Sequence, residues 1–254
     1  MTVTSVGFAP VKGTRHTPYD AVELAAGGPV GDRGLCFVDV GRRRVLRTVQ
    51  NPSLVALAAH REGGELVVEL PAGAVARGAP RPSGETVTCD YWGRPAGLDL
   101  LDGPWAAAVS DYLDAPVRLA AARPGAVVYG AAVSLVTTAS LRDLAERTGR
   151  PALAAETARF RASMVLDTGD EPYAEEAWAS REVRVGAAVL RVNAPIPRCA
   201  VIDLDPATGE RGSGLLKALA RRGVDEHGDP LFGVDAHVVV PGTVRPGDAV
   251  ELLG

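Results

Sequence analysis

The sequence lacks several features that would identify a function directly. It has three cysteines in 254 residues, and no two of them form a Cys-x-x-Cys pair. This pattern argues against a zinc site or a redox dithiol and fits a reduced, cytoplasmic chain. No GxSxG, HExxH, Walker or GxGxxG motif is present. Aromatic residues make up only 5 %, so we expect a core of Val, Leu and Ala.

An excess of charge of one sign is also missing. The 27 basic and 31 acidic side chains give a formal net charge of −4, which argues against non-specific nucleic-acid binding. We interpret the basic run Arg42–Arg44 as a solvated hairpin tip rather than a phosphate-binding patch. The N-terminus has neither the basic start nor the apolar stretch of a signal peptide. An uncharged run over 124–141 is rich in Pro, Gly, Ser and Thr, so we expect two buried strands and a helix start instead of a membrane span.

The order of short segments predicts an α+β fold in two domains, 1–118 and 119–254. In the first, short Val/Leu segments alternate with Gly, Pro, Asn and Asp, which indicates a β-rich, barrel-like domain. It also contains a predicted helix over 104–112 and a predicted surface loop over 77–84. The second alternates between strand-like and helical patterns. Its predicted helices cover 141–148 and 215–222, and its predicted strands cover 133–137, 161–167, 182–193, 198–204, 233–240 and 249–253.

Cys199 is the residue that points most strongly to chemistry. Two nearby prolines stiffen the chain before it, and Arg198 places a permanent positive charge beside the sulfur. A cation favours the thiolate, which is the form that acts as nucleophile and metal ligand. The alternative is a small buried side chain at the start of a strand. Cys36 and Cys89 have no such neighbours and are predicted to lie in the core.

Two further segments could bind an anion. If the chain is extended at Arg159 and Arg161, both guanidiniums project on one face and can bind a phosphate. The alternative is salt bridging at the surface. Ser140 begins a Ser-Leu-Arg-Asp capping box, so it is predicted to cap a helix whose N-terminus could hold an anion. Here the alternative is capping alone.

Single charges at strand ends are weaker signals. Lys12 ends one predicted strand and Arg33 precedes another, where loops commonly build binding sites. Taken alone, each fits a solvated surface charge better than a binding residue. The acidic stretch 225–229 is similar to a metal-binding cluster but fits a polar loop better.

These segments occur together, and in this order, in one known family. The chain resembles MOSC-domain proteins that carry a preceding β-barrel domain, among them the mitochondrial amidoxime reducing component and its bacterial relatives. No single motif is decisive, but the ordered set is specific and runs from residue 8 to residue 248. The matching stretches are Phe8-Ala9-Pro10-Val11-Lys12-Gly13, Gly31-Asp32-Arg33, 133–141, Arg159-Phe160-Arg161, Pro197-Arg198-Cys199, 205–209, Gly242 and Gly247-Asp248.

The resemblance implies a β-barrel-rich MOSC fold and a molybdenum cofactor, in which a phosphorylated pterin holds the metal through two dithiolene sulfurs. It implies that Cys199 is the protein ligand of the metal and the catalytic residue. The chain departs from the common Arg-Phe-Arg-Pro-Asn motif, since Ser163 stands where relatives have Asn and has a shorter hydrogen-bonding reach. The positions implied to hold the cofactor are Lys12, Arg33, Ser140, Arg161, Ser163 and Arg198.

The expected activity is reduction of N-hydroxylated or other N-oxygenated small molecules by removal of an oxygen atom at the cysteine-bound molybdenum. The sequence has no four-cysteine iron–sulfur pattern, so electrons are expected from a separate protein. In a second hypothesis, Cys199 acts without metal as a nucleophile in sulfur transfer or C–S bond cleavage. A third hypothesis is a non-catalytic cofactor carrier.

Overall fold

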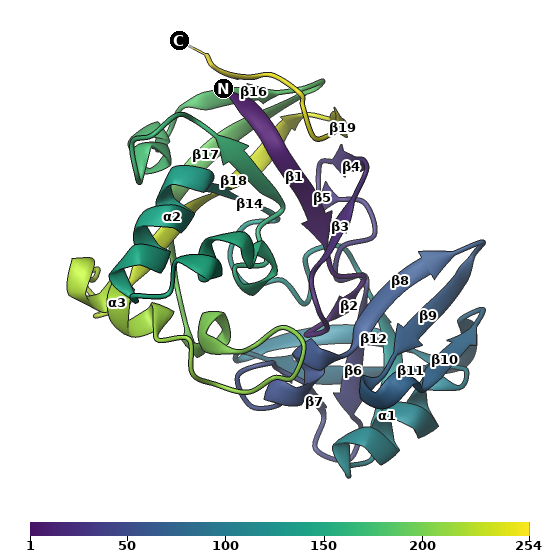
Figure 1. Ribbon diagram of the computed structural model, residues 1–254. Helices are drawn as coiled ribbons and strands as arrows, with labels where there is room; N and C mark the ends of the chain where they lie inside the picture. Colours follow the sequence, from purple (N-terminus) through teal and green to yellow (C-terminus); the bar gives the residue numbers. More distant parts are fainter. Residues whose placement is uncertain (254) are drawn as a thin grey trace.

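The computed structural model describes residues 1–253 and confirms the α+β fold (Figure 1). Its largest sheet has eight strands and gathers both ends of the chain. The short N-terminal strands β1 and β3 lie at one edge of it, beside strands that all come after residue 132. In order across the sheet, the strands are β20 (Val250–Leu252), β16 (Glu182–Val185), β17 (Ala188–Pro197), β18 (Leu231–Val240), β14 (Val133–Thr137), β15 (Met164–Asp167), β1 (Thr2–Phe8) and β3 (Thr17–Tyr19).

The eight-stranded sheet forms one lobe of the molecule, and a six-stranded sheet forms the core of a second lobe. The pairing of β13 with β6 links opposite parts of this sheet. Its strands, in order, are β13 (Arg118–Ala122), β12 (Arg94–Asp102), β11 (Arg81–Tyr91), β7 (Arg44–Val45), β6 (Leu35–Asp39) and β2 (Val11–Lys12). Two three-stranded sheets complete the fold: β10 (Val75–Gly78), β9 (Glu65–Glu69) and β8 (Ala58–Glu62), and β19 (Gly242–Val244), β4 (Val22–Ala25) and β5 (Gly28–Pro29).

Within residues 1–253, three α-helices cover the sheets. The helix α1 (Trp105–Leu113) packs in the lower lobe of Figure 1, while α2 (Thr138–Arg147) and α3 (Leu215–Arg222) lie together on the large sheet. The predicted helices at 104–112 and 215–222 are therefore confirmed, as is the strand at 133–137. Between these elements lie 3₁₀ turns, at Pro52–Ala56, Pro71–Gly73, Pro151–Ala155, Thr157–Arg159, Ala174–Trp178 and Ala200–Asp203.

Three local predictions were wrong. Residues 77–84 belong largely to β10 and β11 rather than to a loop, and a register shift between Pro82 and Thr86 accommodates the proline and glycine there. The strand predicted over 198–204 is replaced by a 3₁₀ turn at Ala200–Asp203. The uncharged run before residue 133 folds as turns, so it contributes one strand and not two.

The two lobes share more of the chain than the predicted boundary at 118/119 suggests, because β1 and β4 pack into the core of the C-terminal sheet. Val3 and Val6 of β1 and Leu24 of β4 are buried in that core with Leu190 and Val234. The division into two domains stays a prediction. Among residues 1–253, no helix combines the length and the apolar composition that crossing a membrane requires.

Candidate functional site

The structure brings Cys199 and four predicted cations to one cavity. Cys199 directly follows β17, at the point where the chain turns into the 3₁₀ segment Ala200–Asp203, and its side chain is exposed. The other two cysteines are buried, as predicted. A cavity of about 210 Å³ opens beside Cys199. Its lining includes Lys12, Arg33, Arg161 and Arg198.

Arg198 is held between two backbone carbonyls. Its Nε donates to the Phe232 carbonyl oxygen at 2.8 Å and its Nη1 donates to that of Phe160 at 3.0 Å. Its Nη2 is buried and has no hydrogen-bond partner within the described part of the chain. Gly233, at φ +65°, leaves room for this guanidinium, because a Cβ there would lie 3.2 Å from the Arg198 Nη2 and only 2.5 Å from the Leu135 carbonyl oxygen. Burial lowers the pKa of Arg198 to about 10, so it stays charged at neutral pH.

Arg33 and Arg161 both occupy the left-handed region of the backbone, at φ +48° and +53°. This conformation is uncommon for residues other than glycine and is often found at functional sites. The Arg161 Nη1 donates to the Thr14 carbonyl oxygen at 2.5 Å, and the Arg33 Nε donates to Asp32 at 2.6 Å. The strained backbone therefore places two guanidiniums at the same cavity.

Lys12 is the cation most affected by its surroundings. Burial, together with the positive charges of Arg33 and Arg161, lowers the pKa of Lys12 to about 7. Its Nζ lies 5.3 Å from the centroid of the Tyr91 ring. Acidic groups compensate this charge only partly: Asp32 pairs with Arg33, and Asp235 accepts hydrogen bonds from Ala131 and Asn193. The cavity is thus suited to an anionic ligand.

Replacement of Lys12 by methionine is expected to stabilise the protein, most strongly below pH 7. In the folded protein the pKa of Lys12 is about 7, against 10.5 in the unfolded chain. Between pH 7 and pH 10.5 the unfolded chain binds more protons than the folded protein, so the unfolding free energy of the unmodified protein rises with pH. Below pH 7 Lys12 is charged in both states, and the folded protein bears the full cost of burying that charge. Thermal melts of both proteins between about pH 6 and pH 10 test this, since the gain in Tm must shrink as pH rises. A gain that does not change with pH would contradict it.

Ser140 was predicted to cap helix α2, and this was wrong. The helix begins at Thr138, and the side chain of Thr137 accepts a hydrogen bond from the Ser140 N–H at 3.2 Å. Ser140 is fully buried and its hydroxyl contacts the carboxylate of Glu175 at 3.0 Å. Glu175 is also fully buried, and burial raises its pKa. The capping site of α2 is therefore closed by the chain's own carboxylate, and Ser140 does not line the cavity.

The hydroxyl of Ser163, like that of Ser140, already has a hydrogen-bond partner within the protein. Its hydroxyl accepts from the Ser134 N–H at 3.1 Å, and the Ser134 hydroxyl accepts from the Ser163 N–H at the same distance. This reciprocal pair joins β14 to the segment that enters β15. Ser134 lines the cavity, whereas Ser163 is buried behind it.

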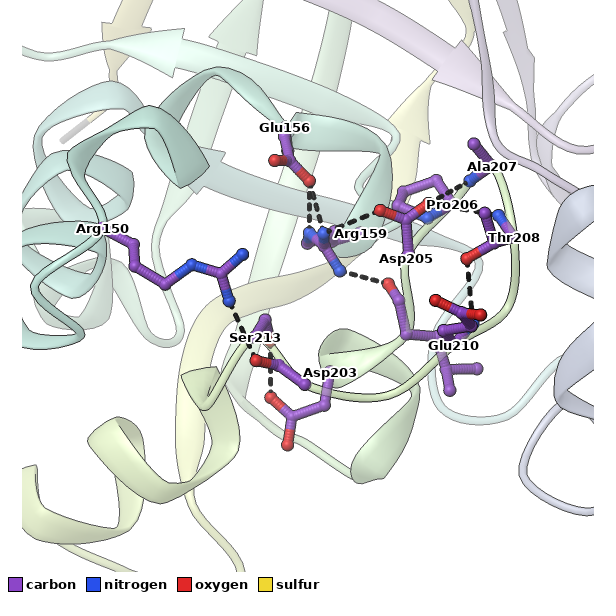
Figure 2. A network of polar contacts seen from close by, with 12 residues as sticks. Arg150, Glu156, Arg159, Asp203, Asp205, Pro206, Ala207, Thr208, Glu210 and Ser213 are labelled. Atoms are coloured by element: carbon purple, nitrogen blue, oxygen red, sulfur yellow. Dashed lines mark hydrogen bonds and ion pairs between the residues drawn. The ribbon is translucent and has the colours of Figure 1, made fainter.

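The extended arrangement predicted for Arg159 and Arg161 was also wrong. Arg159 ends a 3₁₀ turn, and its buried guanidinium faces the loop that follows Cys199 (Figure 2). Its Nε donates to Glu156 at 2.6 Å, its Nη1 donates to the Leu204 carbonyl oxygen, and its Nη2 lies 3.6 Å from Asp205. Although Arg159 lines the cavity, its donors are committed to protein oxygens.

The loop 203–213 is fixed at several further points (Figure 2). The Asp205 carboxylate accepts from the backbone N–H groups of Ala207 and Thr208 at 2.7 and 3.1 Å. Ser213 donates to Asp203 at 2.7 Å, and Arg150 donates to the Gly212 carbonyl oxygen at 2.9 Å. We infer that Arg159 holds this loop against the 3₁₀ segment Thr157–Arg159.

The Arg159→Met variant is expected to lose about 2 to 3 kcal/mol of unfolding free energy, because it leaves the buried Leu204 carbonyl and two carboxylates without their charged donor. Chemical denaturation measures the loss, and limited proteolysis should cut within 203–213 faster than in the unmodified protein. Arg184→Met is the matched control, since Arg184 is exposed on β16. Equal stability of the two variants would contradict the role given to Arg159.

A second cavity, of about 320 Å³, adjoins the first and shares Lys12, Arg198 and Cys199 with it. Sequence reasoning missed the residues that distinguish its lining, chiefly Arg47 and Trp92. The Trp-Gly pair between two strand-like segments was a detectable turn signal. Nothing in the sequence pattern places Arg47 at the same cavity as Cys199, because that cavity depends on how the two lobes pack.

Comparison with known proteins bears on the C-terminal half above all. A family model described as "MOSC domain" matches residues 118–251, more than half of the chain. The chain is 34 % identical over 128 residues to mitochondrial amidoxime-reducing component 1 of Mus musculus, which covers 47 % of this chain and 36 % of the relative. It is also 33 % identical over 95 residues to a molybdenum cofactor sulfurase of Anopheles gambiae. That alignment covers 34 % of this chain and 12 % of the relative. The chain therefore spans well under half the length of these relatives.

Among solved structures, the YUAD protein from Bacillus subtilis aligns over 99 % of this chain and 94 % of its own, with a TM-score of 0.46 and 11 % identity. YiiM from Geobacillus stearothermophilus aligns over 48 % of this chain and 54 % of its own, with a TM-score of 0.36 and 20 % identity.

Proposed function

The chain belongs to the MOSC-domain family, and from this premise we propose that the cavity beside Cys199 binds a molybdenum cofactor for the reduction of N-hydroxylated or other N-oxygenated small molecules. One observation carries the proposal: four cations converge on a cavity at an exposed thiol, with little opposing acid. The relatives that match are an amidoxime-reducing component and a molybdenum cofactor sulfurase, which supports a molybdenum-cofactor-binding family.

The residues present fit a phosphorylated, sulfur-rich ligand. The buried Nη2 of Arg198 has no partner within residues 1–253 and is free to donate to an anion. Lys12, Arg33 and Arg161 would supply further positive charge to a phosphate. Among the described residues, no cluster of three or more His, Cys, Asp or Glu side chains could hold a metal. A thiolate is a suitable ligand for a sulfur-bound metal, so Cys199 would supply a protein ligand.

When bound, the cofactor would supply a two-electron centre able to take up the substrate oxygen, with electrons delivered by a separate donor protein. The chain's own residues would anchor and orient it. Arg198 is immobilised by two carbonyls and Arg161 by one, so both present their charge without further loss of side-chain freedom. Lys12, with a pKa near 7, would gain a proton as an anion binds, which ties anion affinity to pH.

Elemental analysis of the purified protein tests the proposal. After expression in a host that makes the cofactor, we expect about one molybdenum per chain, and background levels from a host that cannot make it. The Arg184→Met variant serves as a control and should carry the same amount. Background molybdenum from the competent host would contradict the proposal.

The exposure of Cys199 and the similarity to a molybdenum cofactor sulfurase favour a second candidate. In it, the Cys199 sulfur acts without metal in sulfur transfer or C–S bond cleavage. Mass spectrometry of metal-free protein after reaction with thiosulfate, whose outer sulfane sulfur would pass to the Cys199 thiolate as sulfite leaves, distinguishes the two. A stable persulfide on Cys199 together with molybdenum at background would favour the second candidate over the first.

A further inference from the structure

Two exposed aromatic residues meet beside Cys199. Trp92 is 45 % exposed and Tyr129 is 63 % exposed, and they are the only aromatic side chains among the strongly exposed large hydrophobic residues of 1–253. Their ring centroids lie 5.5 Å apart and the ring planes are tilted by 52°. In a chain with few aromatic residues, this pairing at the surface needs an explanation.

The pair comes from distant parts of the sequence and lines one cavity. Trp92 lies in the turn between β11 and β12, and Tyr129 lies in the segment between β13 and β14. Both line the cavity of about 320 Å³ that also contains Lys12 and Cys199. This volume is within the range of small-molecule sites, which commonly combine aromatic walls with a few polar groups.

Folding alone does not account for the tryptophan. Trp92 and Gly93 are the two central residues of a tight hairpin, at φ +56° and +76°. Asn or Asp is strongly preferred before glycine in such a turn, since a bulky side chain is strained at positive φ. Despite this backbone strain, Trp92 stays 45 % exposed, and the guanidinium of Arg47 lies over its indole ring, 4.3 Å from the ring centroid.

We propose that Trp92 and Tyr129, with Arg47 packed on the indole, form a recognition site for a flat aromatic ring of the substrate beside Cys199. A tilted, exposed pair offers both a ring face and a ring edge, the arrangements in which a third ring packs favourably. Arg47 fixes the indole orientation. This inference rests on the proposed function in naming the substrate class: N-hydroxylated compounds whose reacting group is attached to a planar ring.

Two matched probes test ring recognition. Benzamidoxime carries a flat phenyl ring, and cyclohexanecarboxamidoxime carries a puckered ring of similar size. Trp105 and Trp178 are buried, so a ring that binds at the pair should quench mainly the fluorescence of Trp92. We expect the flat probe to bind roughly fivefold more tightly than the puckered one.

The Trp92→Asn variant removes the ring but suits the backbone of the turn, so its Tm should not fall. We expect this variant to bind the flat probe roughly fivefold more weakly, and the puckered probe nearly unchanged, by isothermal titration calorimetry. Tyr129→Leu should weaken binding of the flat probe and leave binding of the puckered probe nearly unchanged. Tyr129→Phe, which keeps the ring, should bind both probes like the unmodified protein.

The outcomes separate this inference from the proposed function. Ring-selective binding that disappears in Trp92→Asn supports the recognition site, even if the molybdenum-loaded protein reduces neither probe. Reduction of both probes with no ring preference, unchanged in Trp92→Asn, would overturn the recognition site while the proposed function stands.

Discussion

The Cys199→Ala variant is expected to lose all reduction of N-hydroxylated substrates while unfolding at the same temperature as the unmodified protein. Cys199 is exposed in an irregular segment, where truncation typically changes stability by less than about 0.5 kcal/mol. Its loss removes the proposed protein ligand of the metal, but leaves the cations that hold the rest of the ligand. Turnover with an artificial reductant and a thermal melt measure the two effects separately.

The other cysteines provide the contrasting control. Cys89 is buried in β11, in the core of the six-stranded sheet. The Cys89→Ala variant should therefore lose stability by about 1 kcal/mol but retain its turnover per folded molecule. Full activity in Cys199→Ala would exclude both the metal-dependent and the sulfur-handling roles of that sulfur.

The Arg198→Met variant is expected to bind inorganic pyrophosphate roughly ten- to a hundredfold more weakly than the unmodified protein. Charge-assisted hydrogen bonds to an anion contribute about 1.5 to 3 kcal/mol each, and Arg198 has one buried donor with no other partner in residues 1–253. The substitution also leaves the Phe232 and Phe160 carbonyls without their donor, so we expect lower stability as well. Isothermal titration calorimetry and chemical denaturation measure the two losses.

A second variant keeps this prediction testable if Arg198→Met folds poorly. Arg198→Lys retains the charge but cannot reach two carbonyls and an anion with a planar fork, so its pyrophosphate affinity should be intermediate. Arg184→Met removes an exposed charge on β16 and should leave the affinity unchanged. If Arg184→Met and Arg198→Met weakened binding equally, the anion would not be bound in the Cys199 cavity.

The residues that the sequence singled out at four positions and at Cys199 lie together in the structure, whereas the local structure predicted around Ser140 and Arg159 was wrong. Lys12, Arg33, Arg161, Arg198 and Cys199 were chosen from four separate motifs, and the structure places all five at one cavity. The order of these motifs along the chain is what indicated that the residues belong together. What the sequence could not show is the distance between them, because it depends on β1 and β2 joining different sheets on either side of the cavity.

The failures have local physical causes. The capping box at Ser140 was misplaced because Thr137, three residues earlier, already supplies the capping oxygen. The partner of Ser140 is Glu175, which lies 35 residues away and has no local sequence signal. Arg159 and Arg161 were assigned the same role by alternation in a strand, but the left-handed backbone of Arg161 turns the chain between them. The Arg161 guanidinium consequently faces the cavity with a single carbonyl partner, whereas the Arg159 guanidinium is bonded to the loop 203–213.

Anomalous diffraction at the molybdenum edge, from crystals of protein made in a cofactor-competent host, tests the central claim most directly. We predict a single anomalous peak within bonding distance of the Cys199 Sγ, with phosphate density in contact with Arg161 and Arg198. A molybdenum peak elsewhere on the chain, or an ordered Cys199 cavity without metal in protein that carries molybdenum by elemental analysis, would contradict it.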